Sequence, residues 1–202
     1  MKRLIAASIL AAILCMTGCS AENAQSSENS AESSVQNDTN TEKGLQIDAS
    51  EEVDSAYIDT LKVYFTAIEQ KDYEAFKKTM YPPYLEAFNA YLQAQGSTPE
   101  ENFQSLCTRF DEDGYESWTL TNLQVSYYPE ENVDLDDFFS AFIDAGIFDE
   151  KLAEDCKKNA EEIRDVQFSL QALYAGDEAP VTVVSGNEIM MVKTADGTYL
   201  FG

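Results

Sequence analysis

The side chains that could act as acids, bases, nucleophiles or metal ligands are unevenly represented in this sequence. It contains 37 Asp and Glu residues, 11 Tyr and 4 Cys, but no His. Because histidine is the commonest general base and metal ligand, its absence excludes Ser–His and Cys–His nucleophiles and His-containing zinc sites. The chemistry that remains is that of a carboxylate whose pKa is raised in an apolar pocket, acting with a tyrosine.

Four aromatic residues could line a pocket of this kind: Tyr57, Tyr64, Trp118 and Tyr199. However, no Asp or Glu falls within the apolar stripes of the sequence. Aromatic residues at helical spacing belong to a core more often than to a site. The pattern therefore predicts no catalytic residue.

Two cysteines, Cys107 and Cys156, lie in the part of the chain that is predicted to fold. They could form a disulfide, since such bridges persist outside the reducing cytosol. Alternatively, both are buried free thiols, because Cys107 shares an apolar helical stripe with Phe103 and Leu106, and Cys156 shares one with Leu152. The sequence leaves both interpretations open.

The acidic run Asp111-Glu112-Asp113-Gly114 resembles a calcium-binding EF-hand loop only in part. If Gly114 is placed at the sixth loop position, Arg109 falls at the first and Leu120 at the last, where carboxylates are required. We therefore predict no metal site and no cofactor.

The charge of the chain limits its partners. Its formal net charge is −24 at pH 7, from 13 basic and 37 acidic residues. A surface of this kind repels nucleic acids and other polyanions, so nucleic acid is excluded as a partner.

The N-terminal residues have the pattern of a bacterial export signal. Lys2 and Arg3 precede an uncharged apolar run, 4–14, which is shorter than the roughly 20 residues that span a bilayer. Met16-Thr17-Gly18-Cys19 follows, and small residues before a cysteine at this place resemble the lipobox of bacterial lipoproteins. One departure is Met16, where the family usually has Leu.

The resemblance implies that the leader, 1–18, is cleaved between Gly18 and Cys19, and that the Cys19 thiol carries lipid. Two or three acyl chains, each contributing about 0.8 kcal/mol per buried CH₂, would hold the protein on the extracytoplasmic face of the cell membrane. The alternative is ordinary cleavage after Ala21 and free secretion.

The rest of the chain divides into two parts by composition. Residues 19–50 are rich in Ser, Asn and Glu and nearly lack large apolar side chains, which predicts a disordered tether. Residues 51–202 carry every aromatic residue, and about 150 residues of this composition are enough for one domain with one core.

Apolar residues spaced three and four apart predict helices in the first part of the domain and again beyond its middle. Asp48 or Ser50 could cap the first helix, and Thr98 and Glu101 form a capping box for the fourth. The predicted helices cover 57–68, 72–80, 84–95, 98–110, 134–145 and about 150–164.

Alternation with a period of two predicts strands between and after these helices. The strand that begins at Trp118 changes phase near Asn122, which predicts a β-bulge there. The other predicted strands are 166–174, 181–184, 189–193 and 198–201. The order predicts an α+β domain with helices packed on one face of an antiparallel sheet.

Two segments resemble the nuclear-transport-factor-2-like superfamily. They are the helical opening Val63-Tyr64-Phe65-Thr66-Ala67-Ile68-Glu69-Gln70-Lys71-Asp72-Tyr73-Glu74-Ala75-Phe76 and the closing Asp196-Gly197-Thr198-Tyr199-Leu200, in which Thr198 stands where lipoprotein members often have Trp. The chain is most similar to uncharacterised Gram-positive lipoproteins of this type. The resemblance implies a curved antiparallel sheet whose helices close a cone.

These observations predict a membrane-anchored, non-catalytic module that binds a small molecule, a peptide or an envelope protein. One alternative is a structural protein of envelope assembly. Another is an enzyme that uses a carboxylate and a tyrosine inside the cone.

Overall fold

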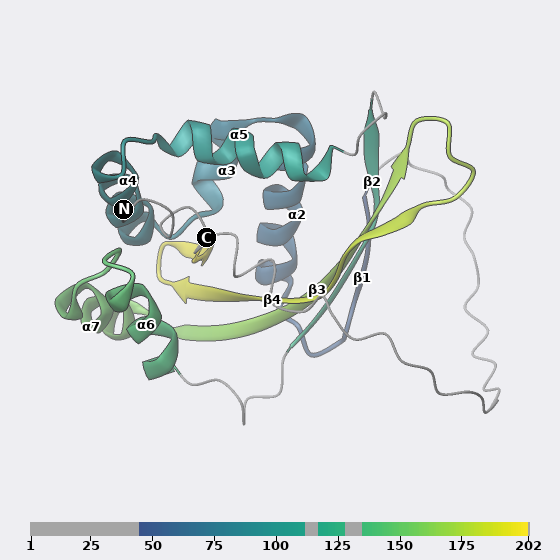
Figure 1. The fold of residues 1–202 in the computed structure, drawn as a ribbon. Helices are drawn as coiled ribbons and strands as arrows, with labels where there is room; N and C mark the ends of the chain where they lie inside the picture. The colour runs from purple at the N-terminus through teal and green to yellow at the C-terminus, as the bar shows by residue number, and fades with distance from the viewer. Residues whose placement is uncertain (1–44, 112–116, 128–134, 202) are drawn as a thin grey trace, which may run out of the picture.

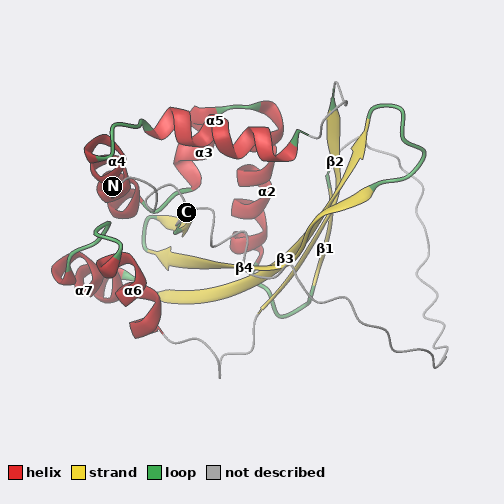
Figure 2. Cartoon of the chain, in the orientation of Figure 1, coloured by secondary structure: helices red, strands yellow, loops and turns green. Residues whose placement is uncertain are grey.

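The computed structural model describes residues 45–111, 117–127 and 135–201. The leader, Cys19 and residues 20–44 of the predicted tether lie outside these ranges, as does the 112–114 part of the run that resembles an EF-hand. Figures 1 and 2 show helices gathered on the concave side of one curved sheet. Among the described helices, none combines the length and the hydropathy needed to cross a bilayer.

The described residues form six helices and five strands. The helices are α2 (Ser55–Gln70), α3 (Tyr73–Thr79), α4 (Pro82–Ala94), α5 (Pro99–Phe110), α6 (Leu135–Asp144) and α7 (Glu150–Asn159). The strands are β1 (Gln46–Ala49), β2 (Trp118–Tyr127), β3 (Glu162–Tyr174), β4 (Val181–Thr194) and β5 (Gly197–Leu200). The fold is therefore α+β, with helices on a curled half-barrel sheet that is consistent with the predicted cone.

The sheet has the order β1-β2-β3-β4-β5 and is mixed, because β1 pairs with β2 in parallel while the other pairs are antiparallel. This corrects two predictions: the sheet is not wholly antiparallel, and the segment assigned to the tether (19–50) includes a strand of the domain. Strand β1 is short and half of its residues are polar, so its sequence alone does not predict a strand. It joins the sheet by pairing with Asn122–Val125, far along the chain.

Bulges bend the long strands of the sheet. The register between β2 and β3 shifts between Leu120 and Asn122, which confirms the predicted bulge. The predicted strands 181–184 and 189–193 are instead one strand, β4, whose register against β3 shifts twice. Gly186 lies at one shift with φ of 58°, a left-handed conformation that glycine adopts without strain.

Polar caps determine where most helices begin. Asp54, not Asp48 or Ser50, caps α2, and its side chain accepts a hydrogen bond from the Ala56 N–H at 2.9 Å. The capping box of Thr98 and Glu101 at α5 is confirmed. The last helix ends at Asn159 rather than near 164, because the chain from Glu162 pairs with β4.

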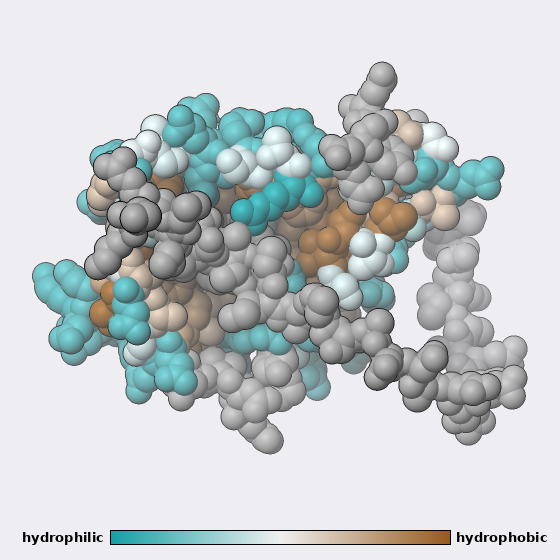
Figure 3. Space-filling model, in the orientation of Figure 1, coloured by the Kyte–Doolittle hydropathy of each residue, from teal (hydrophilic) through white to brown (hydrophobic). Residues whose placement is uncertain are grey.

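Apolar contacts join the helices to the sheet. Phe65 of α2 contacts Phe168 of β3, with ring centroids 5.1 Å apart. Phe201, which follows β5, packs against rings of α4 and α6: Tyr84 at 6.2 Å, Phe138 at 5.5 Å and Phe139 at 5.7 Å. Polar side chains cover the outward faces of the helices in Figure 3, whereas an apolar area shows between α2 and the strands.

Candidate functional site

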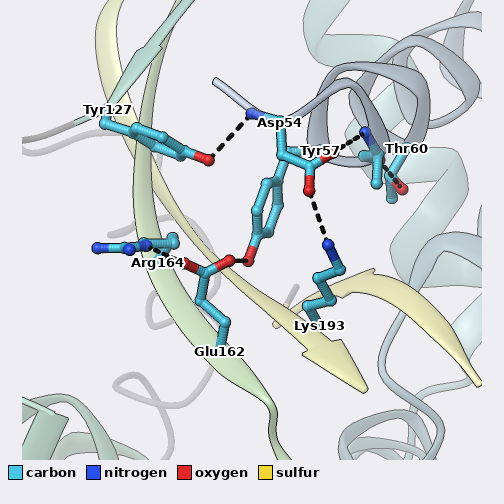
Figure 4. Close-up of polar contacts among 8 residues, drawn as sticks. Asp54, Tyr57, Thr60, Tyr127, Glu162, Arg164 and Lys193 are labelled. Carbon is cyan, nitrogen blue, oxygen red and sulfur yellow. Dashed lines mark hydrogen bonds and ion pairs between the residues drawn. The ribbon is translucent and has the colours of Figure 1, made fainter. Parts of the chain in front are cut away.

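Polar side chains from four elements meet where α2 begins (Figure 4). The Asp54 carboxylate lies 2.7 Å from the Lys193 Nζ of β4, and the Asp54 N–H donates to the Tyr127 hydroxyl of β2 at 3.1 Å. Since the same carboxylate caps α2, the ion pair fastens the helix start to the sheet.

A second set of contacts lies beside this pair. The Tyr57 hydroxyl donates to Oε2 of Glu162 at 2.9 Å, and Nε of Arg164 donates to Oε1 of Glu162 at 2.6 Å. The Arg164 guanidinium lies 5.5 Å from the centre of the Tyr127 ring. Glu162 and Arg164 lie on the inner face of the sheet because they share the parity of the buried Val166 in β3.

We call this group the N-terminal cluster of α2. It consists of Asp54, Tyr57, Tyr127, Glu162, Arg164 and Lys193. The four charged side chains remain between 29% and 38% exposed, whereas Tyr57 is fully buried. The charges are therefore held in place by the fold and are still within reach of a ligand.

Neighbouring groups shift the pKa values of this cluster. The hydrogen bond from Lys193 and the Ala56 N–H lower the pKa of Asp54, and the bond with Asp54 raises the pKa of Lys193. Burial, followed by the bond to the Glu162 carboxylate, raises the pKa of Tyr57 well above its ordinary value. Tyr57 therefore stays protonated near neutral pH and acts as a hydrogen-bond donor.

The polar groups of this cluster are engaged with one another. Both oxygens of Glu162 already accept hydrogen bonds, from Tyr57 and Arg164. A general base must instead reach the proton that it removes. What the cluster offers a ligand is a fixed pattern of two carboxylates and two cations.

A second group of polar contacts lies where α2 ends, and we call it the C-terminal cluster of α2: Glu69, Lys71, Asp111 and Trp118. Oε1 of Glu69 accepts a hydrogen bond from the Leu120 N–H at 3.1 Å, next to the bulge in β2. Asp111 accepts from Lys71 Nζ at 3.1 Å and from Trp118 Nε1 at 2.8 Å.

The four aromatic residues that could line a pocket lie in different surroundings. Tyr57 belongs to the N-terminal cluster and Trp118 to the C-terminal cluster. Tyr64 packs against Phe76, with ring centroids 5.2 Å apart, and Tyr199 lies 6.1 Å from the ring of Tyr81. Within the described ranges, no ring contact joins any two of these four residues.

Cys107 and Cys156 are both buried and unpaired in the structure. Burial raises the pKa of Cys107, and it raises the pKa of Cys156 to about 11. Both thiols therefore stay protonated at neutral pH and lack the reactivity of a thiolate.

The outer face of the sheet carries one perturbed carboxyl group, on Asp165. Burial and the nearby Glu188 carboxylate raise the pKa of Asp165 to about 6. Within the described part of the chain, no group of three or more Cys, Asp or Glu side chains is arranged to hold a metal ion.

Sequence reasoning missed most of the N-terminal cluster. Glu162 and Arg164 were assigned to a helix, whereas they open β3, and Lys193 lay in a predicted strand without a partner. One signal was available: Glu162 and Arg164 continue the even-numbered parity of the apolar residues from Val166 to Tyr174.

Comparison of the chain with models of known protein families finds none that matches, and comparisons with curated proteins and with solved structures find no match either. Any functional conclusion therefore depends on the sequence and on this geometry.

Proposed function

We propose that this chain is a lipid-anchored, extracytoplasmic binding module without catalytic activity. The observation that carries the binding role is the N-terminal cluster, in which the start of α2 and the strands β3 and β4 hold two carboxylates and two cations, each about one-third exposed. The pattern Met16-Thr17-Gly18-Cys19 after an apolar run supports the anchor. The nuclear-transport-factor-2-like resemblance supports a concave ligand-binding face by analogy with that fold.

The ligand that fits this cluster is a small polar molecule or a peptide that carries both signs of charge. Asp54 and Glu162 would meet its cationic group, and Lys193 and Arg164 its anionic group. Because the chain has a net charge of −24 and repels anions, an anionic group would bind only next to local cations such as these.

Thermal unfolding in the presence of zwitterionic metabolites and short peptides tests the binding role, since a ligand that binds the native state raises the melting temperature. Lys193→Gln should abolish the shift. Lys158→Gln, which alters an exposed lysine of α7, is the matched control and should retain it. If no compound shifts the wild type while an envelope protein co-purifies with it, a structural role in envelope assembly replaces this proposal.

The anchor is tested separately. Cys19→Ala should release the protein from membranes or leave its leader uncleaved, and mass spectrometry of the wild type should find acyl chains on an N-terminal Cys19. An unmodified thiol there, or a mature chain that begins farther along, contradicts the anchor.

One observation favours a second candidate, an enzyme that uses a tyrosine and a carboxylate. Tyr57 donates to Glu162 at 2.9 Å, which is the pair that such an enzyme requires. Turnover of a carbonyl-activated substrate that is lost in Glu162→Gln but retained in the exposed control Glu154→Gln would establish this candidate.

A further inference from the structure

The C-terminal cluster of α2 holds the single tryptophan of the chain in a defined position. Trp118 is partly exposed, and its indole N–H donates to Oδ1 of Asp111 at 2.8 Å. One face of the indole packs on Phe110, with centroids 5.6 Å apart and an angle of 26° between the rings. Among the described residues, no other aromatic ring contacts Trp118. The fold therefore orients an aromatic surface with a carboxylate at its edge.

The charges around this ring favour a cation. The negative face of an indole attracts cations more strongly than that of any other side-chain ring. The bonds from Trp118 and Lys71 lower the pKa of Asp111, so that its carboxylate stays charged into the acid range. The net charge of −24 draws cations towards the molecule and repels anions.

Hydrogen bonding narrows the class of cation. Both oxygens of Asp111 are already acceptors, one for Trp118 and the other for Lys71. A primary amine or a guanidinium has several N–H groups to satisfy, and at this site it would share the remaining lone pairs of these two oxygens with Trp118 and Lys71. A quaternary ammonium group has no N–H, so it needs only the aromatic face and the nearby negative charge.

The positive charge of Lys71 would repel such a ligand. Its ammonium lies 3.1 Å from Asp111 and is half exposed, at 51%. It is also the one non-glycine residue in the described ranges with a positive φ, 56°, in the left-handed region that side chains rarely adopt. The end of α2 thus places a positive charge beside the site, and that charge lowers the affinity for a second cation.

We propose that Trp118 and Asp111 form a binding site for a quaternary ammonium group of the choline type, with Lys71 limiting its affinity. This site lies at the opposite end of α2 from the N-terminal cluster, and it depends neither on that cluster nor on the lipid anchor.

Because Trp118 is the only tryptophan, its fluorescence reports directly on the site. The full chain in a maltoside detergent, excited at wavelengths where tyrosine does not absorb, is titrated with choline chloride and, in parallel, with sodium chloride at matched ionic strength. Choline should change the emission saturably. The neutral isostere of choline, which has carbon in place of nitrogen, should not change the emission in this way.

Three variants sharpen the test. Lys71→Gln retains a donor for Asp111 but removes the opposing charge, so it should tighten choline binding about fivefold. Asp111→Asn keeps an acceptor for the indole and removes the negative charge, and should weaken binding about tenfold. Arg109→Gln, which removes a nearby cation from the exposed side of α5, is the control for general charge and should change the affinity less than Lys71→Gln does.

Free choline and a phosphocholine headgroup share this chemistry, and phosphocholine forms a further arm of the titration. Free choline should bind more tightly, because the acidic protein repels the phosphate. Tighter binding of phosphocholine supports the same site with a headgroup as its ligand. An equal response to the neutral isostere or to sodium chloride, or unchanged choline affinity in natively folded Asp111→Asn, overturns the proposal.

Discussion

Each end of α2 combines an ion pair with an aromatic residue, but the two aromatic rings differ in their exposure. At the N-terminal cluster, Asp54 and Tyr57 of the helix bind Lys193 and Glu162 of the sheet, and the aromatic ring of Tyr57 is fully buried. At the C-terminal cluster, the ion pair of Lys71 and Asp111 lies beside Trp118, whose ring is partly exposed. The comparison teaches that an ion pair beside an aromatic residue leaves the ring buried at one end of the helix and accessible to a ligand at the other.

The comparison requires that the middle of α2 hold the helix to the sheet, so that each end can be altered separately. Phe65 is 1% exposed and contacts Phe168. Phe65→Ala should lower the free energy of unfolding by about 3–5 kcal/mol, through lost burial and a cavity. Chemical denaturation measures this change. Val63→Ala, at a 46% exposed position of the same helix, should stay within about 0.5 kcal/mol of the wild type; similar losses in both variants would contradict the prediction.

At the C-terminal end, Glu69 has a structural role that is separate from the proposed cation site. Its carboxylate accepts from the Leu120 N–H, next to the bulge in β2. Glu69→Ala should lower the free energy of unfolding by about 1–3 kcal/mol and speed hydrogen exchange at the Leu120 amide. Glu69→Gln retains an acceptor, so its free energy of unfolding should fall by less than half as much as that of Glu69→Ala. An equal loss in both variants would show that charge, not the hydrogen bond, matters.

At the N-terminal end, the hydroxyl of Tyr57 is predicted to stabilise the fold modestly. Tyr57→Phe removes the bond to Glu162 while the ring remains packed near Tyr127, so the free energy of unfolding should fall by about 1 kcal/mol. Tyr84→Phe is the matched control, because the buried Tyr84 hydroxyl has no hydrogen-bond partner within the described structure. Its removal should cause no loss, and a loss equal to that in Tyr57→Phe would refute the role of the Glu162 bond.

The carboxyl groups at the two ends of α2 and the one on the outer face of the sheet are predicted to affect stability in opposite ways as the pH changes. The pKa values of Asp54 and Asp111 are lowered, so their stabilising contributions are complete above the ordinary value of 3.8 and are lost only below it. The pKa of Asp165 is raised to about 6, so its ionisation destabilises the folded state as the pH rises from about 4 to 6.

Asp165→Asn should therefore raise the free energy of unfolding at pH 7 by about 1 kcal/mol, a figure reduced for the partial exposure of this residue. The gain should shrink as the pH falls and disappear below the ordinary pKa of 3.8, where the wild-type carboxyl group is protonated in both the folded and the unfolded state. Urea unfolding at several pH values measures the difference. A gain that does not vary with pH would mean that Asp165 does not titrate in this window.

Much of the local structure could be predicted because it depends on neighbouring residues. The capping box of Thr98 and Glu101 and the phase change near Asn122 are both visible within a few residues, and the structure confirms both. The end of the last helix could not be predicted in the same way. Glu162 and Arg164 suit a helix by composition, and only their pairing with β4 makes them part of a strand.

The candidate site was less predictable than the fold. Of its residues, only Tyr57 was identified as a candidate from the sequence. Its partner Glu162 is 105 positions away, and Lys193 is 139 positions from Asp54, so no local pattern connects these residues.

By itself, the sequence determined the helical faces, most of the strands and the strongly negative charge, because burial periodicity and ionisable groups are properties of short segments and of composition. The tertiary structure alone decided that Gln46–Ala49 joins the sheet in parallel and that charged residues converge at the start of α2. The reason is physical: strand pairing and ion pairs join groups far apart along the chain, and their positions follow only once the whole sheet has formed.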